Sequence, residues 1–226
     1  MRDVVLVHGA FVDGSGWEAV YRILKAEGYR VHVVQHPAVS LQADVAATRA
    51  VIDLLDGPVV LVGQGYGGVV ITEAGNHEKV ARLVYVAAFV PDSEESVQAL
   101  CAHPLPGTPI PPMLAPVKGF LRLDHARFPE AMAAGLAPER AAFMASSQRP
   151  FGMAAYTGMV GSPAWRSKPS WYLVATGDRM IAPQLQRAMA RRAGAVVEEA
   201  AGCHVLQESH PSIVAGLIGQ AAHLPA

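Results

Sequence analysis

The sequence predicts an α/β fold in which about six mostly parallel strands form a sheet with helices on both faces. Short apolar runs stop at glycine- or histidine-bearing turns, and amphipathic segments with helical spacing lie between these runs. A continuous apolar run of four to eight residues is typical of a strand buried on both faces. Alternation of such strands with helices requires a parallel sheet, and here the alternation lapses only between residues 91 and about 168.

The first half of the chain supplies four expected strands and three expected helices. The strands are predicted at residues 3–7, 30–34, 59–62 and 82–87. Residues at helical spacing mark the first two helices, both amphipathic: Trp17, Val20, Tyr21 and Leu24, then Leu41, Val45, Thr48, Ile52 and Leu55. Gly28 suits the C-cap of the first helix, and a third helix is expected from about Tyr66 to Ala74.

The last quarter of the chain returns to the same alternation. Strands are expected at residues 170–176 and 195–199. A helix between them should start at Pro183, because proline is favoured in the first turn. A final helix is predicted from near Pro211 to about Ala222.

Residues 91–168 form the least regular part of the chain. The stretch HPLPGTPIPP (103–112) is too rich in proline for regular structure, and helical fragments follow it. An insertion this long in a compact domain is usually functional or disordered. Its apolar residues predict a packed helical cap: Met113, Phe120, Leu121, Phe128, Met132, Phe143, Met144, Met153 and Trp165. We therefore expect residues 1–226 to form a single domain with a cap insertion at about 91–168.

The composition excludes several classes of protein. With a net charge of −1, the chain should have no broad attraction to nucleic acid or to an anionic membrane. No apolar stretch approaches the roughly 18 residues of a membrane helix, and the N-terminal run is too short for a signal peptide. Cys101 and Cys203 are expected to be free thiols of a cytoplasmic protein. No histidine, cysteine or aspartate cluster has metal-site spacing, so neither a metal nor another cofactor is expected.

The stretch GQGYGG, residues 63–68, matches two motifs. It fits the G-x-G-x-x-G of a dinucleotide-binding turn, and it fits the G-x-S-x-G of a serine hydrolase with Gly65 in place of the serine. A dinucleotide site usually follows the first strand and needs an acidic residue about 20 positions later. Here the turn follows the third strand, and the next strand ends in Ala87-Ala88-Phe89. A nicotinamide oxidoreductase is therefore the disfavoured alternative.

The hydrolase motif makes further demands, and the sequence meets them. The nucleophile should be followed in the chain by an acid and then by a histidine. Asp178 follows the strand at 170–176, and His204 follows the last strand. Ala10 lies in the loop after the first strand, from which a backbone N–H for an oxyanion hole is drawn.

The chain resembles the small α/β-hydrolase-fold serine esterases, a group that includes plant methylesterases, hydroxynitrile lyases and many bacterial esterases. The segments that carry this resemblance are VVLVHGAF, VVLVGQGYGG, LVYVAAFVPD, WYLVATGDRMI and the loop containing His204. The resemblance implies an α/β-hydrolase fold and hydrolysis of a small apolar ester, amide or lactone without a cofactor. It also implies a Ser-His-Asp triad that uses His204 and Asp178, and an oxyanion hole formed by the N–H groups of Ala10 and Tyr66. Phe11 is expected to line the substrate pocket.

Gly65 is the departure from the pattern, because these proteins carry the nucleophilic serine there. Removal of such a nucleophile costs about 10⁶ in turnover, so we expect impaired catalysis with ligand binding retained. The glycine is either a deliberate replacement or the mark of a naturally non-catalytic binding protein. Slow hydrolysis by a water activated by His204 is disfavoured, because no metal or second carboxylate is evident to help. His8 and Cys203 are expected to have structural roles.

Overall fold

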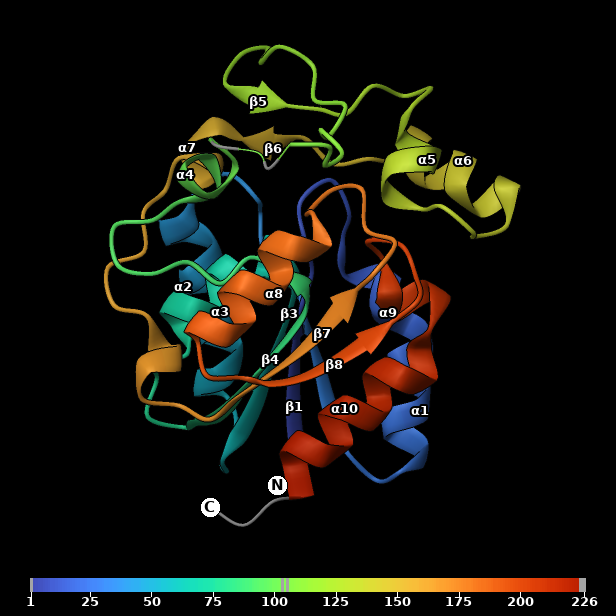
Figure 1. The fold of residues 1–226 in the computed structure, drawn as a ribbon. Coiled ribbons are helices and arrows are strands. Elements are labelled where there is room, and N and C mark those ends of the chain that lie inside the picture. Colours follow the sequence, from blue (N-terminus) through green and yellow to red (C-terminus); the bar gives the residue numbers. More distant parts are fainter. Residues whose placement is uncertain (1, 103, 105, 224–226) are drawn as a thin grey trace.

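A six-stranded parallel sheet forms the centre of the molecule, which confirms the expected fold class (Figure 1). The computed structural model describes residues 2–102, 104 and 106–223. In the sheet the strand order is β2-β1-β3-β4-β7-β8. The strands are β1 (Asp3–Val7), β2 (Arg30–Val34), β3 (Val59–Gly65), β4 (Val80–Ala88), β7 (Ser170–Ala175) and β8 (Val196–Ala200).

Helices cover both faces of this sheet (Figure 1). One face carries α2 (Leu41–Asp53), α3 (Gly67–Ala74) and α8 (Pro183–Arg192), and the other carries α1 (Glu18–Ala26) and α10 (Pro211–His223). Alternate residues of a strand enter different cores: Val5 packs with the first group of helices, and its neighbours Val4 and Leu6 pack with the second. The sheet is therefore buried on both sides, as its continuously apolar strands predict.

Most expected helix ends are confirmed, and two local expectations are wrong. Pro183 starts α8, and Gly28 follows α1 with a φ of +86°. Tyr21 does not belong to the buried face of α1, since 37% of it is exposed. The third strand does not end at Val62: it continues to Gly65, because its ladder with β4 persists through Gln64–Val86 to Gly65–Ala88.

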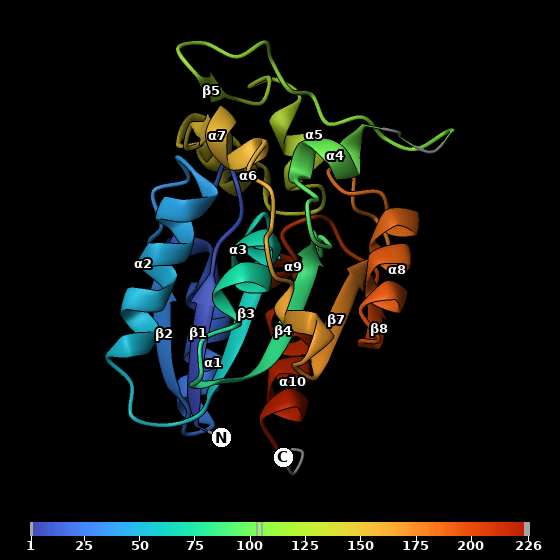
Figure 2. The same cartoon turned by 90° about the vertical axis from the view of Figure 1, so that its left-hand side faces the viewer.

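The insertion forms a cap over the carboxyl ends of the strands (Figure 2). Its helices are short: α4 (Val97–Cys101), α5 (Phe128–Met132), α6 (Pro138–Ser146) and α7 (Met153–Tyr156). It also contains a two-stranded antiparallel ladder that we did not predict, β5 (Phe120–Leu121) with β6 (Phe151–Gly152). The described part of the proline-rich stretch, residues 104 and 106–112, contains no helix or strand. His103 and Leu105 of that stretch lie outside the described residues.

The apolar residues of the cap are only partly buried. Leu121, Phe128, Met132 and Met144 are buried as expected. Phe143 and Phe120 are exposed instead, by 61% and 37%. Short amphipathic fragments have one packed face, so apolar residues on their outer face remain in contact with solvent.

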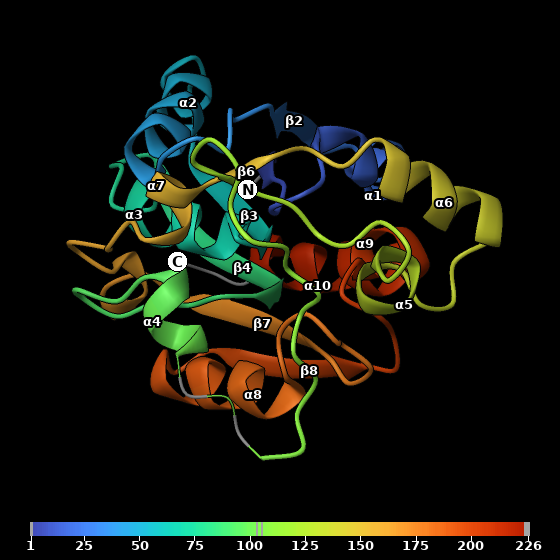
Figure 3. The ribbon, with the colours of Figure 1, turned by 90° about the horizontal axis from the view of Figure 1, so that it is seen from above.

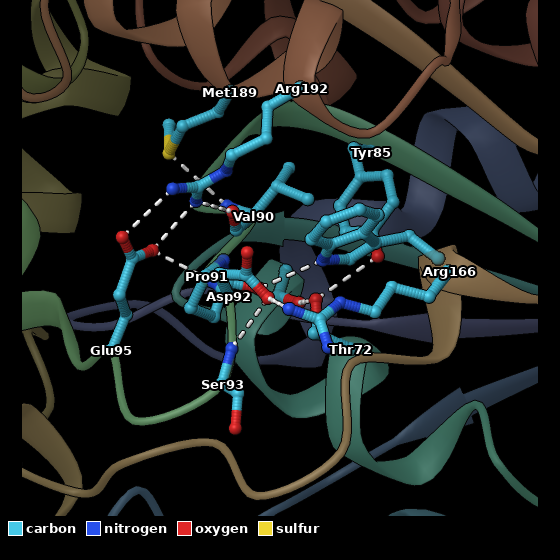
Figure 4. Close-up of polar contacts among 12 residues, drawn as sticks. Thr72, Tyr85, Val90, Pro91, Asp92, Ser93, Glu95, Arg166, Met189 and Arg192 are labelled. Carbon is cyan, nitrogen blue, oxygen red and sulfur yellow. Dashed lines mark hydrogen bonds and ion pairs between the residues drawn. The ribbon is translucent and has the colours of Figure 1, made fainter.

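Residues 90–95, at the start of the cap, are held in place by several polar contacts (Figure 4). We call this segment the cap base. The Arg192 guanidinium pairs with both oxygens of Glu95 at 2.8 and 2.6 Å and donates to the carbonyl oxygen of Val90 at 2.7 Å. Arg166 pairs with Asp92 at 2.5 Å. The bidentate Arg192–Glu95 pair fixes geometry as well as contributing energy and holds the cap base against α8, and the single Arg166–Asp92 contact links the cap base to the end of the insertion.

Three expectations drawn from composition concern the cysteines, membrane-spanning helices and metal ligands. Cys101 and Cys203 are both free, and Cys203 is buried. Among residues 2–102, 104 and 106–223, no helix has the length and apolar character to cross a membrane. The same residues contain no group of three or more His, Cys, Asp or Glu side chains placed to hold a metal ion.

Candidate functional site

Gly65 lies at the sharp turn between β3 and α3. Its φ is +55°, a left-handed conformation that glycine adopts without strain. A Cβ atom added at Gly65 would lie 2.9 Å from Nε2 and 3.4 Å from Cε1 of His204. Any side chain at this position would therefore point directly at the imidazole of His204.

His204 and Asp178 form a buried hydrogen-bonded pair beside this turn. The loop after β8 carries His204 and the loop after β7 carries Asp178, and these adjacent parallel strands end at the same edge of the sheet. Nδ1 of His204 lies 2.8 Å from Oδ2 of Asp178. Because that oxygen belongs to a carboxylate, Nδ1 donates the proton of this bond, and Nε2 faces Gly65.

Two buried glutamines that the sequence analysis missed support this pair. Gln186, on α8, donates from Nε2 to Oδ2 of Asp178 at 2.7 Å, and its Oε1 accepts the Ala175 N–H at 3.0 Å. Gln64, next to Gly65, donates to the carbonyl oxygen of His204 at 3.0 Å. Since the N–H groups of Met180 and Ile181 bind Oδ1 at 2.7 and 3.0 Å, Asp178 accepts four hydrogen bonds and is held in one orientation.

The backbone N–H groups of Ala10 and Tyr66 border the same turn, and each belongs to an anchored peptide group. The carbonyl oxygen of Gly9, in the peptide that carries the Ala10 N–H, accepts from Nδ1 of His8 at 2.9 Å. Burial lowers the pKa of His8 to about 3, so the ring is neutral and donates from Nδ1. The carbonyl oxygen of Gly65, in the peptide that carries the Tyr66 N–H, accepts from Phe89 N–H at 3.1 Å. Within the described part of the chain, neither N–H has a protein acceptor.

Asp44 is a further buried carboxylate that the sequence analysis did not single out. Its Oδ2 accepts the Tyr66 hydroxyl at 2.7 Å, and its Oδ1 accepts the Ala38 N–H at 2.7 Å. Burial and the neighbouring Asp44 charge raise the pKa of the Tyr66 hydroxyl above its usual range, so the phenol remains protonated and donates. Nδ1 of His36 lies 3.3 Å from Oδ1 of Asp44. Asp44 therefore ties α2 to the residue that follows Gly65.

Replacement of Tyr66 by phenylalanine should destabilise the protein by about 1.5–3 kcal/mol, because the buried Asp44 carboxylate loses a hydrogen-bond donor. The free energy of unfolding in urea measures this loss. Tyr21→Phe is the control, since Tyr21 is 37% exposed and should change stability by less than about 0.5 kcal/mol. Equal stability of the two variants would contradict a structural role for the Tyr66–Asp44 bond.

An apolar cavity opens above Gly65 and beneath the cap. It encloses about 470 Å³, its opening included, and Ala10, Phe11, Tyr66, Phe151, Met180 and His204 are among its lining residues. Phe11 has a φ of +65° and packs edge-on against Phe151 of the cap at 5.7 Å between ring centroids. Of the described lining residues, none is Asp, Glu, Lys or Arg. The cavity suits an uncharged apolar ligand.

The other glycines of the GQGYGG stretch are needed for close packing. A Cβ at Gly67 would lie 2.5 Å from the carbonyl oxygen of Val7, and a Cβ at Gly68 would lie 2.2 Å from that of Phe89. Real Cβ atoms essentially never approach other atoms this closely. The glycines therefore allow α3 to contact the ends of β1 and β4, which explains the pattern without a nucleotide.

Comparisons with known proteins identify relatives with esterase activities. A carbendazim hydrolyzing esterase of Nocardioides sp. is 33% identical over 121 residues, 47% of this chain and 50% of that protein. Methylesterase 8 of Arabidopsis thaliana is 31% identical over 112 residues, 41% of this chain and 39% of that protein. The chain thus spans about half the length, or less, of the curated relatives it matches.

Solved structures and a family model cover far more of the chain. The crystal structure of a pyrethroid hydrolase from Sphingobium faniae superposes with a TM-score of 0.83 over 99% of this chain and 98% of that one, at 21% sequence identity, which supports the fold. The model of the Alpha/beta hydrolase family matches residues 4–217. The chain therefore belongs to the Alpha/beta hydrolase family.

Proposed function

We propose that this chain has the site of a carboxylic ester hydrolase that acts on small apolar esters, with Gly65 in the position of the nucleophilic serine. In this proposal His204 is the general base and then the general acid, and Asp178 orients its imidazole. The N–H groups of Ala10 and Tyr66 stabilise the oxyanion. The observation that carries the proposal is the 2.9 Å between the Cβ position of Gly65 and Nε2 of His204.

The proposed chemistry is acyl transfer, and its nucleophile is missing in this chain. In a complete triad the serine oxygen attacks the ester carbon while histidine takes its proton, and the oxyanion develops opposite two N–H donors. Glycine has no atom that can attack. We therefore infer that the chain binds its ester and that hydrolysis is impaired, by about 10⁶ if the loss matches that of a deleted nucleophile in another triad.

The named activities of the relatives support an ester as the ligand. A carbendazim hydrolyzing esterase, a pyrethroid hydrolase and a methylesterase are among the proteins similar to this chain. The uncharged lining of the cavity and the net charge of −1 fit a small neutral molecule better than nucleic acid or a membrane surface.

Gly65→Ser should create hydrolysis of 4-nitrophenyl acetate, measured by nitrophenolate release. The imidazole of His204 must shift by a few tenths of an ångström to admit the serine Cβ, after which the hydroxyl can reach Nε2. Stability should fall by about 1–3 kcal/mol, because a non-glycine residue at a φ of +55° is strained.

Gly65→Ala is the matched control, since it carries the same strain and the same Cβ without an oxygen. It should release no more nitrophenolate than the unmodified chain. A folded Gly65→Ser protein as inactive as Gly65→Ala would refute the hydrolase proposal.

A naturally non-catalytic ligand-binding protein is the second candidate. The observation that favours it is the position of His204, which already crowds a Cβ at Gly65 and so fits glycine better than serine. This candidate predicts that Gly65→Ser binds phenyl acetate and does not hydrolyse it. Calorimetric binding together with the turnover assay separates the two candidates.

A further inference from the structure

A second apolar cavity, which we call the side chamber, adjoins the cavity above Gly65. It lies between α4, residues 104 and 108–111, and the start of α8, and Figure 3 shows α4 and α8 on the same side of the molecule. Leu100, Ile110, Ala182 and Leu185 line the side chamber and do not line the first cavity.

The two cavities are neighbours that share part of their walls. Phe89 follows β4, Met180 and Ile181 follow Asp178, and Tyr156 ends α7, and all four line both cavities. A ligand whose carbonyl lies beside Gly65 and His204 can therefore extend past Tyr156 toward Leu185. The free space of the side chamber, counted with its opening to solvent, measures about 720 Å³.

The described lining of the side chamber offers no partner to a charged group. Its described lining residues include no Asp, Glu, Lys, Arg or His. Cys101 is shared with the first cavity, and burial raises the pKa of its thiol to about 11, so it is neutral at pH 7. A carboxylate or ammonium group placed here would lose its hydration without gaining an ionic partner, which is strongly unfavourable.

Resting on the proposed function, we propose that the side chamber is a subsite for an uncharged apolar group on the ester. The substrate class is then a neutral ester with apolar groups on both sides of its carbonyl. One group occupies the cavity beside Phe11, and the other occupies the side chamber beside Leu100 and Leu185. Half-esters of dicarboxylic acids, which place a carboxylate at that distance, are excluded.

Calorimetric titration of the unmodified protein with three phenyl esters tests this subsite. Phenyl acetate occupies the first cavity alone, phenyl hexanoate adds four methylenes, and monophenyl adipate places a carboxylate at a similar distance. Each buried methylene should tighten binding about fourfold, so phenyl hexanoate should bind at least about tenfold more tightly than phenyl acetate even if half the chain is buried. Monophenyl adipate should bind no more tightly than phenyl acetate.

Leu185→Trp, which fills the side chamber, should remove the advantage of phenyl hexanoate and leave the affinity for phenyl acetate unchanged. Leu54→Trp is the control, because Leu54 is 83% exposed at the end of α2 and lies outside both cavities. Equal affinities of the unmodified protein for phenyl acetate and phenyl hexanoate would overturn the subsite and leave the proposed function standing. Failure of the unmodified protein to bind phenyl acetate would overturn the proposed function as well.

Discussion

Asp178→Asn in the Gly65→Ser protein should lower kcat for 4-nitrophenyl acetate by about 10⁴, the loss known for the equivalent change in a chymotrypsin-like triad. Oδ1 of Asp178 accepts two backbone N–H groups, so the single amide oxygen of asparagine must take that side. The amide NH₂ then faces Nδ1 of His204, which has to become an acceptor. The proton moves to Nε2, and His204 can no longer accept the proton of the serine.

Asp53→Asn is the matched control, because the Asp53 side chain is 65% exposed and pairs with His77 rather than with His204. It should leave kcat unchanged. The low-field proton resonance of Nδ1 in the Gly65→Ser protein should disappear in the Asp178→Asn variant. Retention of more than a tenth of kcat by that variant would remove Asp178 from the proposed mechanism.

Gly68→Ala should destabilise the protein by about 3 kcal/mol, at the upper end of the usual cost of overpacking. The added Cβ would lie 2.2 Å from the carbonyl oxygen of Phe89 and 2.8 Å from Cβ of Ala88. Backbone cannot give way as a flexible side chain can, so α3 must move away from the end of β4. Urea unfolding, followed by circular dichroism, measures the loss.

Gly216→Ala is the control in the same unfolding experiment, and it should not lower the stability of the protein. Gly216 lies within α10 and has no atom within 4 Å of its Cβ position. Alanine favours a helix interior over glycine by about 1 kcal/mol, so this variant should be at least as stable as the unmodified protein. A similar loss in both variants would show that close packing of α3 is not the cause.

The sequence was sufficient to predict the elements that depend on local pattern. The six strands and the helices at Pro183 and Pro211 follow from apolar periodicity and from proline at a first turn. The end of β3 was placed too early, because Gly65 has low strand propensity and only its pairing with Ala88 of β4 extends the strand. The β5–β6 ladder was missed because each strand has two residues, too few to show an alternating pattern.

Gln64 and Asp44, which support the candidate site, could not be predicted, because each binds a partner remote in sequence. Gln64 binds the backbone of a residue 140 positions later, and Asp44 binds a hydroxyl 22 positions later. Their periodicity resembles that of any strand or helix residue, and only the assembled fold reveals their partners. Gly65, His204 and Asp178 were recognisable because the order of a nucleophile turn, an acid and a histidine along the chain is itself a pattern. Their catalytic roles remain predictions.

The cap base has a consequence for the evolution of substrate range. The N–H of Glu94 donates to the carbonyl oxygen of Val160 at 2.8 Å, and the N–H of Val160 donates to the carbonyl oxygen of Glu95 at 3.0 Å. These two points of the chain are thus neighbours, so the intervening 64 residues, 96–159, form a loop with closed ends. Recombination at this junction would exchange one cap for another while β3, β7 and β8 keep their places. Substrate selectivity would then change while the residues at the ends of these strands stay the same.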